Sequence, residues 1–143
     1  MQNNQNSRLA ASMRGSTRKY EKSALTKDMA DEYVRRLIQF MDVAKPYLDP
    51  NLTLAKLAGR VSIRTHHLSQ VINEQLHEGF FDFINRYRIE EAKRRLCDPS
   101  LSHYSIMGVA NEVGFRTKSV FNSAFKKRTG MTPSEFRVAK TQT

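Results

Sequence analysis

The chain has 143 residues, which is enough for one domain or two very small ones. Lysine and arginine outnumber aspartate and glutamate by 24 to 14, and the resulting net charge of +10 indicates a polyanionic partner, either nucleic acid or an anionic membrane surface. Apolar residues make up 39%, which argues against global disorder, while the single cysteine excludes an internal disulfide framework and no apolar run approaches the ~20 residues that span a bilayer.

The N-terminal segment, residues 1–24, shows no apolar period and is rich in glutamine, asparagine, serine and arginine, so we expect it to be disordered. Part of it, Met13–Ser16 (MRGS), resembles an expression-vector leader. From Asp28 onward, apolar residues recur at three- and four-residue steps, which predicts an amphipathic helix. Its expected core face consists of Met29, Tyr33, Leu37, Ile38, Met41 and Ala44. Pro46 is expected to end this helix, and the segment PYLDPN to form a turn.

Two shorter helices are predicted next. Thr53 is expected to cap the first, TLAKLAGR, whose inward residues are Leu54, Leu57 and Ala58. A tight turn at Val61–Ile63 follows, and the second helix is predicted from Thr65 to about Gln75. Its apolar stripe consists of Leu68, Val71 and Ile72.

A longer helix is predicted from about Phe80 to Leu96, where Asp98-Pro99 ends it. The apolar residues that set its period are Phe80, Phe83, Ile84, Tyr87 and Ala92. Seventeen residues at ~1.5 Å each make this helix about 25 Å long. Cys97 follows it, and we interpret Cys97 as a small helix-end residue rather than a redox sensor, because no histidine flanks it.

The scheme then recurs toward the C-terminus. Ser105 is expected to cap the helix SIMGVANEV, Gly114-Phe115 to form a turn, and a helix to run from about Lys118 to Arg128. A last short helix is predicted near Pro133, with Phe136 inward. No segment alternates with period two, so no sheet is expected and the predicted fold class is all-α.

The two sets of short helices form an internal repeat. Thr53, Leu54, Leu57, Ala58, Val61, Ser62 and Ile63 lie 52 positions before Ser105, Ile106, Val109, Ala110, Val113, Gly114 and Phe115. After the turn the offset becomes 53, and Leu68, Ile72 and Phe83 match Phe121, Phe125 and Phe136. The repeated unit has the pattern of a helix–turn–helix, with a small residue, Ala58 or Ala110, where its two helices approach closely.

The second helix of each unit has an exposed face suited to DNA. In the first copy this face holds Arg64, Thr65, His66, Ser69, Gln70 and Asn73. In the second it holds Arg116, Thr117, Lys118, Ser119, Asn122, Ser123, Lys126 and Lys127. Such side chains donate to phosphates and to base edges in a major groove, and a helix capped by Thr117 presents its positive dipole end to phosphate. A solvated polar face is the alternative for either copy alone, and the recurrence in both favours DNA.

The helix between the copies would act as a stiff spacer. Major grooves on one side of B-DNA recur every ~34 Å, so a spacer of about 25 Å plus two flanking helices places both recognition helices in successive grooves. An imperfect fit would be met by bending the DNA, at a cost of a few kcal/mol that added contacts offset.

These residues resemble the AraC/XylS-type transcription regulators over roughly Asp28 to Arg137. The most specific match is ANEVGFRTKSVFNSAFKKRTGMTPSEFR, Ala110–Arg137, and LTLAKLA, LSQVINE and FFDFINRYRIEEAKRRL also fit. The resemblance implies about seven helices, with two helix-turn-helix subdomains joined by a long linker helix (homeodomain-like). It implies a bacterial regulator that binds double-stranded promoter DNA and recruits or assists RNA polymerase.

The resemblance also implies roles for individual residues. The base-reading positions fall on His66, Ser69 and Gln70 in the first copy and on Lys118, Ser119, Asn122 and Ser123 in the second. We expect Arg64, Thr65, Asn73, Arg116, Thr117, Lys126 and Lys127 to contact phosphates. The chain departs from the family where arginine is frequent at the positions of Gln70 and Ser123, serine at that of Arg64 and glycine at that of His77. The base preference of a relative therefore does not transfer.

The expected organisation is a disordered segment over residues 1–24 and a DNA-binding domain over 25–140. That domain divides into a first helix-turn-helix subdomain (25–79), the linker helix (80–97) and a second subdomain (98–140). We expect no cofactor, no metal and no small-molecule substrate, and a cytoplasmic protein at the nucleoid. Family members usually carry a separate sensor domain, which residues 1–27 are too short to form. The run from His66 to Lys93 resembles a subgroup with membrane-embedded sensors, so the cytoplasmic part of a membrane-anchored regulator is an alternative.

Three other functions compete with promoter binding. An enzyme is disfavoured, because His66 and His67 point about 100° apart on a helix and no nucleophile–base motif or phosphate-binding glycine loop occurs. A sequence-indifferent nucleic-acid binder, working through charge alone, stays open. A protein–protein module docking through Met29–Ala44 is less favoured, since that helix is expected to build the first core.

Overall fold

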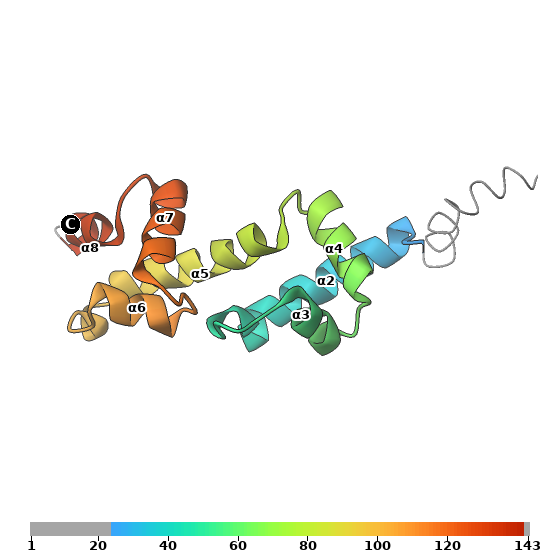
Figure 1. Cartoon of the computed structure of the whole chain (residues 1–143), viewed down its shortest axis with the longest axis horizontal. Helices are drawn as coiled ribbons and strands as arrows, with labels where there is room; N and C mark the ends of the chain where they lie inside the picture. The colour runs from blue at the N-terminus through green and yellow to red at the C-terminus, as the bar shows by residue number, and fades with distance from the viewer. Residues whose placement is uncertain (1–23, 142–143) are drawn as a thin grey trace, which may run out of the picture. The chain divides into compact units, whose positions relative to one another are not determined.

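The computed structural model of the chain describes residues 24–141. In chain order the elements are α2 (Lys27–Ala44), the 3₁₀ helix η1 (Pro46–Leu48), α3 (Leu54–Val61), α4 (Thr65–Glu74), α5 (Phe80–Leu96), the 3₁₀ helix η2 (Pro99–Leu101), α6 (Ile106–Glu112), α7 (Lys118–Thr129) and α8 (Pro133–Thr141). Within this range there are seven α-helices and no strand, so the predicted all-α class is confirmed (Figure 1). The prediction of disorder for residues 1–24 falls, apart from Ala24, outside the described residues. None of the described helices is long and apolar enough to cross a membrane.

Residues from Tyr33 onward form one compact unit, whose boundary lies inside α2. In this unit, α2 contributes Leu37 and Met41, both fully buried, to a first hydrophobic core. Ala44 was predicted on the same face, and this was wrong, because Ala44 is exposed. The reason is that α2 ends there: Lys45 adopts a left-handed backbone with φ 48° and Pro46 starts η1, so the last turn of α2 extends past the core.

The first core is completed by α3, α4 and the start of α5. Its buried members are Leu37, Met41, Tyr47, Leu52, Leu57, Ala58, Val61, Ile63, Leu68, Ile72, Phe83 and Ile84. Thr53 caps α3 as predicted, its hydroxyl oxygen accepting from the Lys56 amide at 3.1 Å. Leu54, predicted inward, is only partly buried, since it lies in the first turn at the margin of the core.

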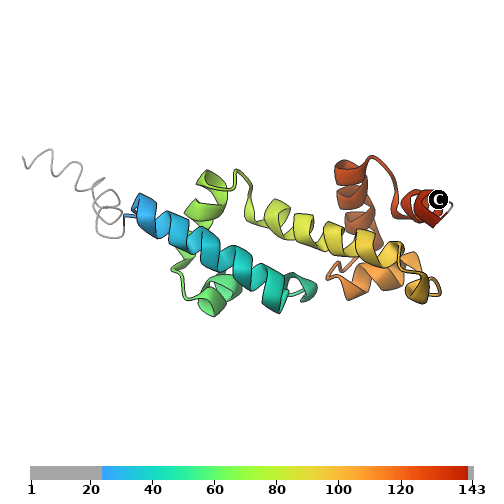
Figure 2. The ribbon, with the colours of Figure 1, turned by 180° about the vertical axis from the view of Figure 1, so that it is seen from behind.

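A second core surrounds the end of α5. It holds Ile89, Ala92, Leu96, Val109, Ala110, Val113, Phe115, Phe121, Phe125 and Phe136. Thus α5 gives Phe83 and Ile84 to the first core and its later turns to the second, and seen from behind it runs between the two groups of helices (Figure 2). Burying a phenylalanine side chain contributes roughly 1.5–3 kcal/mol, so the aromatic residues dominate the second core.

The predicted repeat is visible in the backbone of its turns. In the first copy the Ile63 amide donates to the Ala58 carbonyl at 3.1 Å, and in the second the Phe115 amide donates to the Ala110 carbonyl at 2.9 Å. The residue before each donor has a positive φ, 57° for Ser62 and 104° for Gly114. Both turns therefore close the C-terminal end of the preceding helix in the same way. Ala58 and Ala110 are buried beneath them.

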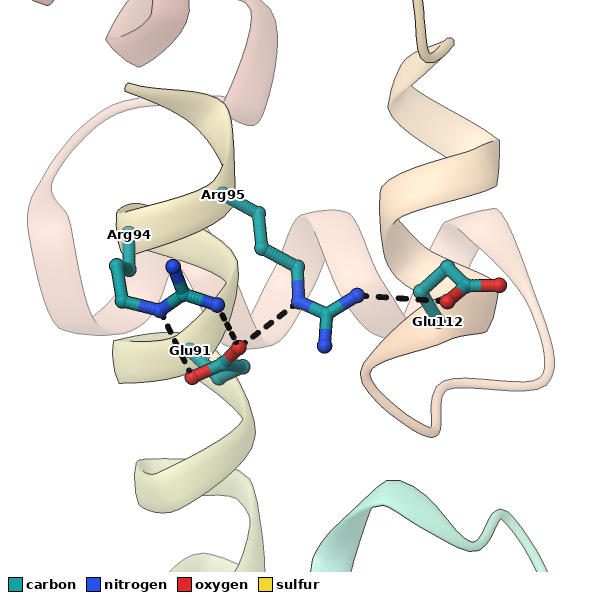
Figure 3. Close-up of polar contacts among 4 residues, drawn as sticks. All are labelled: Glu91, Arg94, Arg95 and Glu112. Atoms are coloured by element: carbon teal, nitrogen blue, oxygen red, sulfur yellow. Dashed lines mark hydrogen bonds and ion pairs between the residues drawn. The ribbon is translucent and has the colours of Figure 1, made fainter. Parts of the chain in front are cut away.

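A buried carboxylate joins α5 to α6. Glu91, 7% exposed, accepts hydrogen bonds from Arg94 and from the Arg95 Nε at 2.8 Å, and Arg95 also reaches Glu112 on α6 at 3.4 Å (Figure 3). Burial alone would raise the pKa of the Glu91 carboxyl, but the hydrogen bonds and charges of Arg94 and Arg95 outweigh burial and lower the pKa below its usual value. Glu91 is therefore ionised at neutral pH and helps to hold α6 against α5.

Candidate nucleic-acid interface

The position of α4 is set by α3 and α2. Helix α3 packs against α4, and Arg36 of α2 donates to the carbonyl oxygens of Val61 and Ser62 at 3.0 and 3.2 Å, where α3 ends. His67, Leu68, Val71 and Ile72 form the buried face of α4. His67 packs its ring 6.0 Å from that of Tyr33, so the two adjacent histidines have different roles.

The opposite face of α4 carries four of the six residues predicted for it, and the other two, Arg64 and Thr65, lie at its N-terminal end. His66, Ser69, Gln70 and Asn73 follow the i, i+3, i+4, i+7 spacing and lie on one stripe. His66 and Asn73 are exposed, while Ser69 and Gln70 are partly buried. The Asn73 amide donates to the Ser69 hydroxyl at 3.4 Å. We call these four residues the α4 stripe, and the structure brings them together at the surface.

One partner of the α4 stripe was not foreseen. The Gln70 amide nitrogen donates to the carboxylate of Glu74 at 3.2 Å, one turn further along α4. A carboxamide has two N–H donors and one carbonyl acceptor, so Gln70 keeps a second donor and its acceptor for another molecule. The Glu74 contact therefore orients the amide. The i, i+4 spacing of the two residues was readable from the sequence.

Helix α7, the counterpart of α4 in the second unit, begins as predicted. Thr117 is its N-cap, with the hydroxyl oxygen accepting from the Val120 amide at 3.2 Å. Phe121 and Phe125 are fully buried. On the other side, Ser119, Asn122, Ser123 and Lys126 repeat the i, i+3, i+4, i+7 spacing; all are exposed except Asn122, which is partly buried. We call these the α7 stripe. With the offset of 53, its members match the α4 stripe position by position.

Lys118 and Lys127 lie off the α7 stripe. Lys118 is exposed in the first turn. Lys127 lies 3.9 Å from a carboxylate oxygen of Asp82 in the first turn of α5, and the neighbouring Arg128 donates to the Asp82 main-chain carbonyl at 2.8 Å. The end of α7 is therefore tied to the beginning of α5. Lys127 remains accessible, with 73% of its side chain exposed.

The N-terminal ends of α4 and α7 differ. Arg64 is the N-cap of α4 and makes no side-chain capping hydrogen bond, whereas Thr117 caps α7. Arg64, Thr65, Arg116 and Thr117 are all exposed. The predicted phosphate-contacting residues at these helix starts are therefore accessible, and a serine in place of Arg64 could supply the missing cap.

Val120 on α7 is a candidate that the sequence reasoning missed. It is 52% exposed and lines a shallow groove with Ser119 and Ser123. Its counterpart in the repeat is His67, which is buried, so the repeat alone did not predict an exposed residue. Its place on the helix, 100° from Phe121, was the available signal. An apolar side chain at such a position can contact the methyl group of thymine.

In both views α4 and α7 lie on the same side of α5, with α4 near the beginning of α5 (Figures 1 and 2). Both helices also contact α5. Among the described residues, no group of three or more histidine, cysteine, aspartate or glutamate side chains is arranged to hold a metal ion. The site thus consists of two polar stripes on helices that occupy equivalent places in the repeat, with Arg64, Arg116, Lys118, Lys126 and Lys127 on or beside them.

Comparison with known proteins gives consistent matches. A family model described as a helix-turn-helix domain matches residues 57–139. The arabinose operon regulatory protein of Escherichia coli (strain K12) is 33% identical over 107 residues, which are 75% of this chain and 35% of that protein. An uncharacterized HTH-type transcriptional regulator of Staphylococcus aureus (strain COL) is 32% identical over 99 residues, 69% of this chain and 13% of that protein. The chain spans about a third or less of the length of these curated relatives.

Solved structures agree. The C-terminal domain of AraT, a response regulator from Geobacillus stearothermophilus, matches with a TM-score of 0.64 and 28% identity, covering 81% of this chain and 88% of that chain. A transcriptional regulator from Chromobacterium violaceum, described by its AraC-type DNA-binding domain, has a TM-score of 0.66 and covers 81% and 98% of the two chains; at 17% identity it supports the fold alone. The matched proteins are transcription regulators, not enzymes, which confirms the non-enzymatic prediction. The duplicated helix-turn-helix unit and these matches show that the chain belongs to the AraC/XylS-type family of DNA-binding domains of transcription regulators.

Proposed function

We propose that this DNA-binding domain recognises a specific double-stranded promoter site by placing α4 and α7 in successive major grooves. One observation supports the proposal above the others. The same four repeat positions on the two helices, His66/Ser119, Ser69/Asn122, Gln70/Ser123 and Asn73/Lys126, all carry polar side chains that reach the surface. A fully solvated face would not require the same four positions in both copies to stay free of carboxylates.

The chemistry of the stripes suits base edges. Glutamine and asparagine pair with the N6 and N7 edge of adenine, serine bonds to several bases, and lysine reaches the acceptors of guanine. The major groove is about 12 Å wide and admits one α-helix. His66, Ser69, Gln70, Lys118, Ser119, Asn122 and Ser123 remain the proposed base-reading residues. Because the two stripes differ in composition, one monomer would read an asymmetric site.

Affinity independent of sequence would come from phosphate contacts. Arg64, Thr65, Asn73, Arg116, Thr117, Lys126 and Lys127 remain the proposed phosphate-contacting residues. Since Lys127 already lies near the Asp82 carboxylate, Lys126 is the better test of this group. Two arginines that relatives often carry are absent at Gln70 and Ser123, so we expect phosphate contacts and DNA shape to supply a larger share of the binding.

A sequence-indifferent basic protein is the alternative function, which the net charge of +10 favours. Both functions predict that affinity falls with salt, by ~0.9 log units per phosphate contact and tenfold change in salt. They differ in selectivity. We expect fragments enriched from random DNA to bind at least ~10³-fold more tightly than bulk DNA at fixed salt, as specific regulators do. Equal affinity for all fragments would establish the alternative.

Two substitutions test the division of roles. Gln70→Ala should reduce discrimination at one base pair in one half-site, by about 1–3 kcal/mol, and leave binding to bulk DNA unchanged. Lys126→Ala should weaken binding to all sequences alike and reduce the salt slope by about one. Lys45→Gln removes an exposed charge outside both stripes and serves as the control. Identical effects of Gln70→Ala and Lys126→Ala on every sequence would contradict the division.

We further propose that the chain acts as the DNA-binding part of a longer sensor-regulator that assists RNA polymerase. The supporting observation is that the arabinose operon regulatory protein, of which the match covers 35%, is longer. The proposed location is the cytoplasm, at the nucleoid, including the case of a regulator anchored in the membrane by another segment. The complete reading frame around this chain, and capture of RNA polymerase on a bound promoter, are the direct tests.

A further inference from the structure

Arg88, in the middle of α5, contacts both halves of the compact unit. Its Nε donates to the Tyr47 carbonyl at 2.7 Å and its Nη2 to the Asp49 carbonyl at 3.0 Å. These carbonyls belong to η1 and the segment after it, 41 and 39 residues earlier in the chain, respectively. On the other side, the guanidinium lies 5.7 Å from the centre of the Phe115 ring. Phe115 belongs to the turn of the second helix-turn-helix unit.

The two sides of this contact belong to different cores. Tyr47 is buried in the first core and Phe115 in the second, and Leu48 packs against both. Gly114 leaves the space for the guanidinium: a Cβ there would lie 2.7 Å from the Arg88 Nε and would also collide with the Tyr47 carbonyl oxygen. Arg88 therefore fills a fitted site between η1 and the turn that leads into α7.

The guanidinium of Arg88 is partly buried. Burial lowers the pKa of Arg88, Asp49 opposes this shift and the nearby Arg116 adds to it. Even so, an arginine keeps its charge, so the two carbonyl acceptors must compensate for lost hydration. A planar guanidinium satisfies both carbonyls at a fixed angle, which a flexible ammonium does not do.

We propose that Arg88 is a positioning residue that sets the spacing and relative orientation at which α4 and α7 meet DNA. The inference rests on the proposed function, since it assumes that both helices bind one DNA molecule. Two modules held rigidly gain about 10²–10⁴ in affinity when the sites match their span, and lose it when the sites do not. Without Arg88, the two helix-turn-helix units keep their own cores, the shared helix α5 and the packing of Leu48, but they lose the hydrogen bonds that join the middle of α5 to the segment Tyr47–Asp49 beside the second turn.

The DNA experiment uses an enriched site and derivatives with one to four base pairs inserted between its half-sites, each insertion adding ~3.4 Å and rotating the second half-site by about 35°. For the unaltered protein, two inserted base pairs should reduce affinity at least about tenfold. Arg88→Met should bind the parent site at least about tenfold more weakly than the unaltered protein does. Its affinity should vary less than about threefold among the sites with inserted base pairs. Arg88→Lys should fall between them. An insertion profile of Arg88→Met identical to that of the unaltered protein would overturn the proposal.

A second measurement needs no DNA. In a Cys97→Ser background, spin labels are attached at two exposed positions, Gln75 after α4 and Ser134 on α8. Pulsed dipolar spectroscopy then reports the distance between the two helix-turn-helix units. For the unaltered protein we expect one narrow distribution of distances between the labels. Arg88→Met should broaden this distribution while its unfolding in urea stays cooperative. Equal widths would refute the role of Arg88. If the unaltered protein shows narrow distances but no preferred spacing on DNA, the two-groove function fails while the positioning role of Arg88 stands. If Arg88→Met does not fold, the widths of the distance distributions are compared between Arg88→Lys and the unaltered protein.

Discussion

Gly114→Ala should destabilise the protein more than any other glycine-to-alanine change for which the structure gives a comparison. Gly114 has φ +104°, a conformation that L residues rarely adopt. In addition, the new methyl group would lie 2.7 Å from the Arg88 Nε and 3.2 Å from its Cζ, and would overlap the Tyr47 carbonyl oxygen. The side chain of Arg88 cannot retreat without leaving that carbonyl.

The expected loss has two parts. Left-handed backbone with a Cβ costs about 1–2 kcal/mol. Displacing a charged donor from the carbonyl of the buried residue Tyr47 costs about 1–3 kcal/mol more. The free energy of unfolding, measured by urea denaturation, should therefore fall by at least about 2 kcal/mol with an unchanged m-value.

Two other glycines separate these parts. Gly130, at the end of α7, has φ +80° and open space around it, so Gly130→Ala should show the backbone cost alone. Gly59 lies exposed inside α3 with nothing within 4 Å, and Gly59→Ala should stabilise the protein by about 0.5–1 kcal/mol. If Gly114→Ala costs no more than Gly130→Ala, the fitted site around Arg88 does not exist as described.

Three further changes test the fold. Glu91→Gln should cost about 1–3 kcal/mol at neutral pH by leaving Arg94 and Arg95 without their carboxylate. Because the pKa of Glu91 is lowered in the folded protein, Glu91 stabilises the fold above its unfolded pKa, and this stabilisation is lost as the pH falls through the folded pKa. The free energy of unfolding of Glu91→Gln should therefore depend less on pH in acid than that of the unaltered protein. An acid dependence identical to that of the unaltered protein would be inconsistent with this role. His77→Gly should leave stability unchanged or raise it by up to about 1 kcal/mol in thermal unfolding, since His77 has φ 57°, and a clear loss would show that the imidazole is needed. Thr117→Ala should lower the free energy of unfolding by about 0.5–2 kcal/mol, because it removes the α7 cap. A loss below about 0.3 kcal/mol would count against that cap.

Local signals carried most of the fold prediction. The bounds of α5 were predicted because Phe80 begins the apolar period and Asp98-Pro99 follows it, and Thr53, Ser105 and Thr117 cap their helices as expected. Such signals act within one turn of the chain, so one sequence contains them. The left-handed conformation at His77 is one that glycine adopts most readily, in keeping with the glycine that the resemblance led us to expect there.

Contacts between distant segments could not be predicted in the same way. Arg88 and Arg36 are arginines on helices and read as solvent-facing charges, yet they bond to carbonyl groups 25 to 41 residues away. Side-chain bonds to main-chain carbonyls leave no period in the sequence. The two stripes were predictable because the repeat supplied each position twice, whereas Val120 was missed because the expected DNA-binding face was defined by polar and cationic side chains alone.

The most direct measurement is a base-contact footprint on a DNA site selected from random sequence. Methylation interference at guanine N7, which lies in the major groove, should give two clusters of contacts centred about 10 base pairs apart on one face of the duplex, with different sequences in the two clusters. Gln70→Ala should alter one cluster and Ser123→Ala the other. A single cluster, a symmetric pair of identical clusters or uniform interference would contradict reading by α4 and α7 of one molecule.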